Sequence, residues 1–247
     1  MKDLHNHIIY GIDDGAKDYQ RSLNLLKNLE SSGVREIVLT PHYIIGSNYN
    51  SNNKIKKEIL TDLQKKTNIK LYLGNEVYID DLIIEYIKNG EISTINNSNY
   101  LLVELPLSEK LECAKDILVQ LRNNGIIPII AHPERYHYID LKELVTYVEM
   151  GCLLQGNITS LGKKYGKKAQ KNLELLLRKN MIHVLGTDIH NSKIENLDKL
   201  IDKLTKIVGV KQADALLNDN FTKIVNNKNV EIKKVKKVNI IFKEKIK

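Results

Sequence analysis

The chain contains few cysteines and none of the segments typical of membrane or exported proteins. Its 247 residues include two cysteines, four prolines and no tryptophan. Cys113 and Cys152 stand apart, which argues against a disulfide framework and fits a reducing compartment. No run of 18 or more apolar residues occurs, and no charged segment followed by an apolar one opens the chain. We therefore expect a cytoplasmic protein.

Negative charge is scarce near the end of the chain. The formal net charge is +8, but residues 228–247 hold eight lysines against two glutamates, so the remainder is close to neutral. No interleaving of aromatic and basic residues marks a nucleic-acid groove, and no nucleic-acid partner is expected. We expect one domain over 1–230 and a lysine-rich extension over 231–247. This extension is either a solvated terminus or a contact for an anionic surface.

The chain also lacks a glycine-rich P-loop and any internal repeat; instead, short β-branched segments alternate with helical ones. This alternation predicts a parallel sheet, and continuous apolar runs such as "IIPIIA" suit strands buried on both faces. Residues 46–57, rich in asparagine and lysine, are expected to form a loop beside the site. The seven strand candidates are "MKDLHNH", "REIVLTPHY", "IKLYLGNEVYI", "YLLVELP", "IIPIIAHPERY", "CLLQGN" and "MIHVLGTDIHN".

Ionisable side chains follow six of these seven strands. On the first strand, His5 and His7 share a face about 7 Å apart, because side chains alternate along a strand. Active sites of α/β barrels lie at this carboxyl edge, where the loops converge. Six contributing strands suit a closed ring better than the single crevice of an open sheet. The groups at strand ends are His5, His7, His42, Glu76, Glu104, His132, Glu134, Arg135, Asp188 and His190.

Imidazoles and carboxylates together form a ligand set for divalent ions such as zinc, manganese or iron. Nine candidates exceed the needs of one ion, so we expect a centre of two or three metals, which would activate water and bind phosphoryl oxygens. The guanidinium of Arg135 suits a phosphate. His137 and His183 lie off the pattern. The nine candidate ligands are His5, His7, Asp14, His42, Glu76, Glu104, His132, Asp188 and His190.

These residues resemble those of the polymerase and histidinol phosphatase (PHP) superfamily, whose D-x-H-x-H opening stands here as "DLHNH". More narrowly, the chain is similar to the bacterial capsule and exopolysaccharide tyrosine-protein phosphatases of the CpsB/CapC/YwqE type. The similarity extends from residue 2 to about 227. It rests on "DLHNHIIYGIDDGAKD", "TPHY", "GNEVYI", "LLVELP", "AHPERY" and "GTDIHN", which match in order and spacing.

The resemblance implies an α/β fold, a distorted (β/α)7 TIM-like barrel, with three manganese ions (iron or zinc being alternatives) at the carboxyl ends of its strands. By position, His5, His7, Glu76 and Asp188 would hold one metal, Glu76, Glu104 and His132 a second, and Asp14, His42 and His190 the third. Arg135, Asp188 and His190 would act in catalysis. Arg135 would bind the phosphate, and Lys193, near the position where the family often carries a second arginine, would supply a second positive charge for substrate binding.

The implied substrate is the phosphotyrosine tail of a membrane-associated tyrosine kinase, and relatives often assemble into homo-oligomers. A cysteine-dependent mechanism is excluded, because the arginine it requires six residues after the cysteine is replaced by Val119 or Ile158. One alternative is a histidinol-phosphatase-like enzyme acting on a small phosphomonoester. Another is a non-catalytic kinase-binding module, against which the full ligand set argues.

Overall fold

Every strand pair in the computed structural model, which describes residues 1–235, is parallel. One sheet has the order β1-β2-β4 and the other the order β3-β5-β6-β7-β8-β9. The strands are β1 (Lys2–Asp3), β2 (Glu36–Leu39), β3 (His42–Tyr43), β4 (Lys70–Leu73), β5 (Glu76–Tyr78), β6 (Tyr100–Glu104), β7 (Ile127–Ala131), β8 (Leu153–Asn157) and β9 (Val184–Gly186).

The two sheets form one barrel of seven strand paths. Only two residues separate β2 from β3 and β4 from β5, so each of these pairs continues one path. The ring closes where the first segment meets the last: the His7 amide donates to the Ile189 carbonyl at 2.8 Å, and Asn6 bridges Ile189 in parallel. The predicted TIM-like barrel is confirmed.

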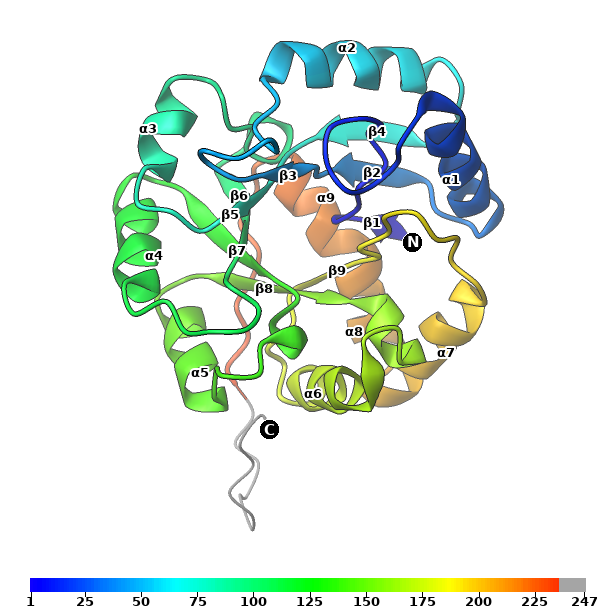
Figure 1. The fold of residues 1–247 in the computed structure, drawn as a ribbon. Helices are drawn as coiled ribbons and strands as arrows, with labels where there is room; N and C mark the ends of the chain where they lie inside the picture. Colours follow the sequence, from blue (N-terminus) through cyan, green and yellow to red (C-terminus); the bar gives the residue numbers. More distant parts are fainter. Residues whose placement is uncertain (236–247) are drawn as a thin grey trace.

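Helices surround the strands, as Figure 1 shows. Side chains of Asp18, Asn52 and Asp140 cap three of them by accepting backbone N–H groups. The α-helices that follow the strands are α1 (Tyr19–Ser31), α2 (Asn53–Gln64), α3 (Ile83–Lys88), α4 (Ala114–Asn123), α5 (Leu141–Glu149), α6 (Gly166–Arg178) and α7 (Leu197–Val208). Short 3-10 turns span Ile95–Asn97, Pro133–Arg135 and Ile158–Gly162.

The prediction of a loop over 46–57 is wrong for its second half. Helix α2 begins at Asn53, because the side chain of Asn52 accepts the Ile55 amide. Lys56 on this helix is fully buried, and its ammonium donates to Asn75 Oδ1 at 2.6 Å. The polar composition of residues 46–57 suggested a loop, and it did not indicate that Lys56 faces inward. Its partner, Asn75, lies between β4 and β5.

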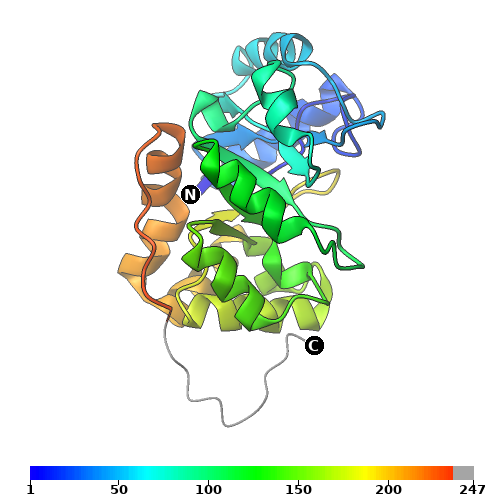
Figure 2. The same cartoon turned by 90° about the vertical axis from the view of Figure 1, so that its left-hand side faces the viewer.

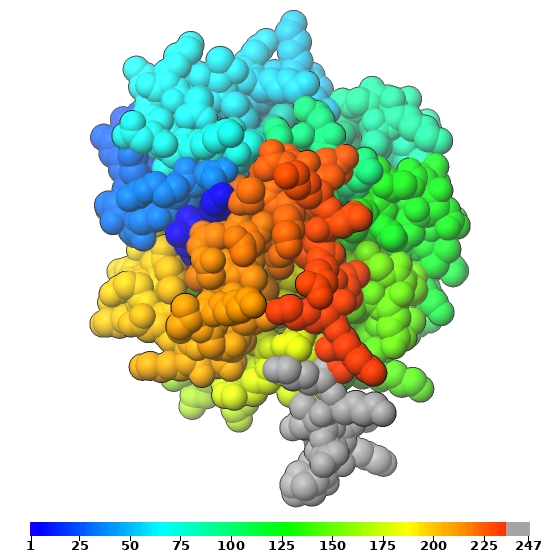
Figure 3. Space-filling view, turned by 180° about the vertical axis from the view of Figure 1, so that it is seen from behind, coloured from blue at the N-terminus to red at the C-terminus, as the bar shows by residue number. Residues whose placement is uncertain are grey.

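A terminal helical segment closes the opposite end of the barrel from the strands' carboxyl edge. It comprises α8 (Val210–Asp214), a π-helical turn (Ala215–Asp219) and α9 (Asn220–Val225). Phe221 and Ile224 of α9 are fully buried and pack with the barrel's interior residues, among them Leu4, Tyr72 and Leu102. Figures 2 and 3 show this orange and red segment covering the back of the molecule.

Val230 packs in the same interior cluster as α9. Of the predicted lysine-rich extension, residues 236–247 lie outside the described residues. Within the described part of the chain, no helix combines the length and apolar character needed to cross a membrane.

Candidate metal centre

The structure brings all nine predicted ligand side chains together at the carboxyl ends of the strands. Seven of them line a cavity of about 460 Å³, and His5 and His7 are fully buried beside it. β3, β5 and β6 position His42, Glu76 and Glu104, and the segments after β1, β7 and β9 supply the rest.

Glu76 lies at the middle of the cluster. Its Oε2 atom is 3.1 Å from both His5 Nε2 and His42 Nδ1, and 3.3 Å from His7 Nε2. Its Oε1 atom is 3.0 Å from His132 Nε2. Oε2 is buried and makes no hydrogen bond within residues 1–235. A buried carboxylate oxygen without a hydrogen bond, surrounded by imidazole nitrogens, fits the requirements of a metal ligand.

Two further carboxylates extend the cluster on either side. Asp188 Oδ1 lies 3.5 Å from both His7 Nε2 and His190 Nδ1, and 3.6 Å from His5 Nε2. Asp14, on the long loop before α1, places Oδ1 3.4 Å from His190 Nε2. Each of these carboxylates therefore lies within 4 Å of at least one histidine nitrogen of the cluster.

Three groups of ligand atoms lie close enough to share an ion each. Two correspond in part to the sets expected by resemblance: the group of His5, His7 and Glu76 lacks Asp188, and the group containing Asp14 also includes His7. The group containing Glu104 includes His42, whereas the resemblance assigned His132; His132 Nε2 nevertheless lies 3.5 Å from Glu104 Oε1. The groups are His5, His7 and Glu76; His42, Glu76 and Glu104; and His7, Asp14, His42 and His190.

Outer contacts fix the orientation of the two N-terminal histidines. His7 Nδ1 lies 2.8 Å from Asp13 Oδ2, and His5 Nδ1 lies 2.9 Å from Gln155 Oε1. Both acceptors require a proton on Nδ1, so Nε2 is the nitrogen that each histidine directs into the cluster. Asp13 also accepts the Gly15 and His42 amides and thereby holds the turn that follows His7.

Asp188 is held by several donors on its other oxygen. Asn157 Nδ2, Tyr165 Oη and Arg135 Nη1 contact Oδ2 at 2.7, 2.8 and 3.0 Å. The sequence analysis did not identify Gln155, Asn157 or Tyr165, since amides and phenols on a strand or loop carry no ligand signature.

Two candidate ligands adopt backbone conformations that side chains rarely take. His132 has φ of 31° and Asp188 has φ of 50°, both in the left-handed region. Such conformations cost about 1–3 kcal/mol each and gather at functional sites. They turn the chain sharply after β7 and β9, so that both side chains face the cavity.

The charges of the cluster stabilise one another. Burial opposes ionisation, but Glu104 and Glu76 outweigh it and raise the pKa of His132 to about 10. Burial alone would also raise the pKa of Asp13, yet the neighbouring His7 lowers it to about 2. Burial lowers the pKa of His190 to about 4, and His7 adds to this effect. The positive charge of a protonated imidazole such as that of His132 therefore balances the negative charge of the carboxylates. Bound metal cations would balance the same negative charge.

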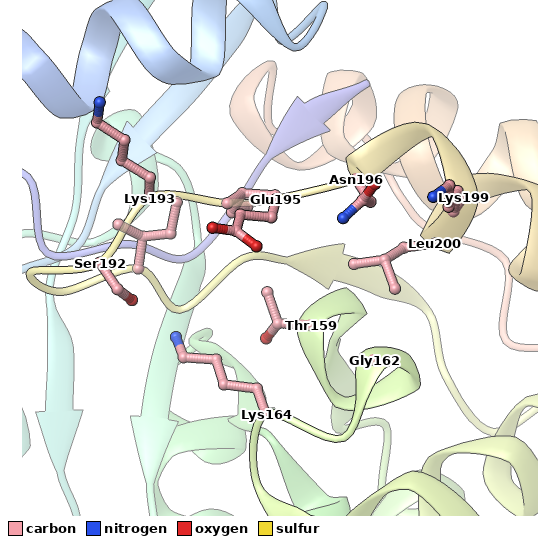
Figure 4. A pocket seen from close by; sticks show the side chains of 11 residues that line it. Thr159, Gly162, Lys164, Ser192, Lys193, Glu195, Asn196, Lys199 and Leu200 are labelled. Carbon is pink, nitrogen blue, oxygen red and sulfur yellow. The ribbon is translucent and has the colours of Figure 1, made fainter.

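A second cavity, of about 430 Å³, adjoins the first. Lys164 and Ser192 line both cavities, whereas Lys193 lines only the second. In Figure 4, the Lys193 side chain extends away from Lys164. The position of Lys193 thus differs from that of Arg135, which lines the cavity containing the cluster.

A parallel α/β barrel with imidazoles and carboxylates at its carboxyl edge is the arrangement of PHP-type proteins. The chain belongs to the CpsB/CapC family of capsular polysaccharide synthesis, whose model matches residues 1–226. It is 38% identical over 198 residues to the putative tyrosine-protein phosphatase CapC of Staphylococcus aureus, covering 77% of each chain. It is 31% identical over 244 residues to the tyrosine-protein phosphatase CpsB of Streptococcus pneumoniae, covering 91% of this chain and 98% of the relative.

Solved structures agree with this assignment. One, reported for YwqE of Bacillus subtilis and CpsB of Streptococcus pneumoniae as unique metal-dependent tyrosine phosphatases, has a TM-score of 0.88 and 26% identity, covering 97% of this chain and 100% of that one. A histidinol phosphate phosphatase of Lactococcus lactis has a TM-score of 0.60 at 16% identity, covering 87% and 94%; this likeness concerns the fold alone.

Proposed function

We propose that this chain is a metal-dependent protein-tyrosine phosphatase that acts on a tyrosine kinase partner in capsular or exopolysaccharide synthesis. The observation that carries the proposal is the cluster of nine imidazoles and carboxylates with Arg135 in the same cavity. The names of the relatives support the phosphotyrosine substrate.

We propose that the nine residues would hold three manganese ions; Glu76 belongs to two of the three ligand groups. When bound, such ions supply Lewis acidity toward phosphoryl oxygens and make water nucleophilic at neutral pH. Glu76 and Asp188 carry the negative charge that the ions require. Asp13 and Gln155 accept from Nδ1 of His7 and His5, so Nε2 is the nitrogen that each histidine would offer to an ion, with release of its proton.

The protein's own groups bind and orient the substrate. A guanidinium has five N–H donors, and Arg135 directs Nη1 to Asp188 Oδ2, so further donors can meet phosphoryl oxygens. In hydrolysis, a bond from phosphorus to water oxygen forms and the bond from phosphorus to the phenolic oxygen breaks. The phenolic oxygen finally takes up a proton. A phenol, with a pKa near 10, is a better leaving group than an alcohol and needs less protonation.

The experiment is hydrolysis of a phosphotyrosine peptide by metal-stripped protein, before and after addition of Mn²⁺. We expect activity only after addition. Turnover of histidinol phosphate or a sugar phosphate together with inactivity toward the peptide would favour a small-molecule phosphatase instead.

Substitution separates the cluster from other histidines. We expect His5→Ala to lose both metal and activity, whereas His137→Ala, at an exposed position outside the cluster, keeps both. Metal content is measured by mass spectrometry. A His5→Ala protein with wild-type metal content would refute the ligand assignment.

We further propose a cytoplasmic location and a homo-oligomeric state. Cys113 and Cys152 are free cysteines, as expected in a reducing compartment. Light scattering of the purified protein tests the oligomeric state, and a monomer at micromolar concentration would contradict that part.

A further inference from the structure

We propose that Lys164 is the second cation that binds the substrate's phosphoryl group, beside Arg135 and in place of Lys193. The proposal rests on the phosphatase function proposed above. It concerns a position outside the stretches that identified candidate ligands.

Placement is the first argument. Lys164 lines the same cavity as the metal cluster and Arg135, whereas Lys193 lines only the adjoining cavity. Figure 4 shows the Lys164 ammonium directed toward Ser192, at the boundary shared by the two cavities, and Lys193 pointing away. Lys164 therefore lies on the wall of the cavity that contains the cluster, at the side where the second cavity adjoins it.

Convergence with Arg135 is the second argument. The Lys164 ammonium lies 5.1 Å from the centre of the Tyr165 ring, and the Arg135 guanidinium lies 4.3 Å from it. Both cations also contact Asp188: Arg135 its Oδ2 atom at 3.0 Å, Lys164 its main-chain oxygen at 2.7 Å. One aromatic ring and one aspartate thus hold two positive charges near each other.

The third argument is charge balance. Arg135 pairs with a carboxylate, but the Lys164 ammonium contacts a neutral carbonyl, and within residues 1–235 no carboxylate lies within ion-pair distance of it. An ammonium has three donors, of which this contact uses one. The residue is exposed, so the other donors can reach a ligand. A doubly charged phosphoryl group supplies the missing negative charge.

The test measures binding of inorganic phosphate to the manganese-loaded protein by calorimetry, together with metal content. We expect Lys164→Met to weaken phosphate binding about tenfold or more, as loss of a charged hydrogen bond does, at unchanged metal content. Lys164→Arg should restore most of the affinity. Lys167→Met, at an exposed position nearby on α6, is the matched control.

Three results would overturn the proposal. They are unchanged phosphate affinity in Lys164→Met, loss of metal in that variant, which would make Lys164 a support for Asp188 only, and a larger effect of Lys193→Met. Phosphate binding is independent of which phosphomonoester is hydrolysed. A wild-type protein inactive on phosphotyrosine peptides would therefore contradict the proposed function while leaving the role of Lys164 measurable.

Discussion

Individual residues around the cluster differ in whether they contact the cavity or orient those that do. Tyr165 combines both roles, because its hydroxyl donates to Asp188 Oδ2 at 2.8 Å and its ring lies under Arg135. Burial raises the pKa of this phenol, so it remains a donor across the physiological range. This hydrogen bond holds Asp188 Oδ2, which leaves Oδ1 facing the histidines.

Tyr165→Phe should therefore lower manganese affinity about tenfold, the lower range for an orienting partner of a ligand, while the retained ring still supports Arg135. Affinity is measured by competition with a chelator. Tyr10→Phe, which changes a tyrosine packed on Tyr19, serves as the control and should have no effect. Equal affinities in wild type and Tyr165→Phe would contradict this role.

The candidate ligands could be found in the sequence because nearly all of them stand at or just after the end of a strand path, and strand ends of a barrel meet at one edge. Their orienting partners were not. Gln155 and Asn157 lie in the apolar segment "CLLQGN", where an amide reads as an ordinary buried residue. Only folding brings them next to His5 and Asp188, across 150 and 31 residues.

At the scale of elements, α2 carries an unusual inward lysine. Lys56 contacts Asn75, whose side-chain amide also donates to the Pro41 carbonyl. Through Asn75, Lys56 therefore links α2 to both of the two-residue segments that separate β2 from β3 and β4 from β5. His42 and Glu76 follow these breaks directly.

Stability should depend on pH through Lys56. Burial lowers its pKa from 10.5 to about 7, so between these values the unfolded chain binds more protons than the folded one. Stability contributed by this group therefore rises as pH increases from 7 toward 10.5. We expect the melting temperature of the wild type, relative to Lys56→Met, to rise between pH 7 and 9.

Lys57→Met, at the exposed neighbouring position, should instead follow the wild type at every pH. Parallel melting curves for wild type and Lys56→Met across this range would show that Lys56 titrates as an ordinary lysine.

Helix α9 is the element that the sequence did not reveal as part of the core. Its apolar residues fit one face of an ordinary amphipathic helix. Phe221 is fully buried because α9 packs against the interior residues of the barrel. Phe221→Ala should cost about 3–5 kcal/mol in free energy of unfolding, measured with urea. Val210→Ala, with its side chain 75% exposed on α8, should cost little.

Because α9 lies at the end of the barrel opposite the cluster, the folded Phe221→Ala protein should keep its manganese affinity. A change in metal affinity equal to that of Tyr165→Phe would mean that the two ends of the barrel are coupled.

For the whole molecule, metal and fold should stabilise each other. A ligand that binds only the folded state raises its stability in proportion to the logarithm of its concentration. Protons compete at the same nitrogens, and the pKa of His132 is raised to about 10, so lower pH weakens metal binding. Added Mn²⁺ should raise the melting temperature more at pH 8 than at pH 6.5, and excess chelator should cancel the increase. A larger increase at the lower pH would contradict this sign.

The parallel sheet and its seven strand paths followed from alternating patterns, which are local, whereas the seven-stranded barrel was expected from the family resemblance. The breaks within two of those paths, at Thr40–Pro41 and Gly74–Asn75, did not follow from these patterns. Where a strand is interrupted depends on how it pairs with the neighbouring path, which is not a local property. The α2 start was likewise hidden by a composition that suits loops.

Ring closure sets a time at which the site can exist during synthesis. The Thr187 hydroxyl donates a hydrogen bond to Asp3, 184 residues earlier in the chain, and the His7 amide donates to the Ile189 carbonyl. At about 5–20 residues per second, the two histidines leave the ribosome roughly ten seconds or more before their partner strand. The complete set of nine candidate ligands therefore exists only after the last strand has joined the barrel.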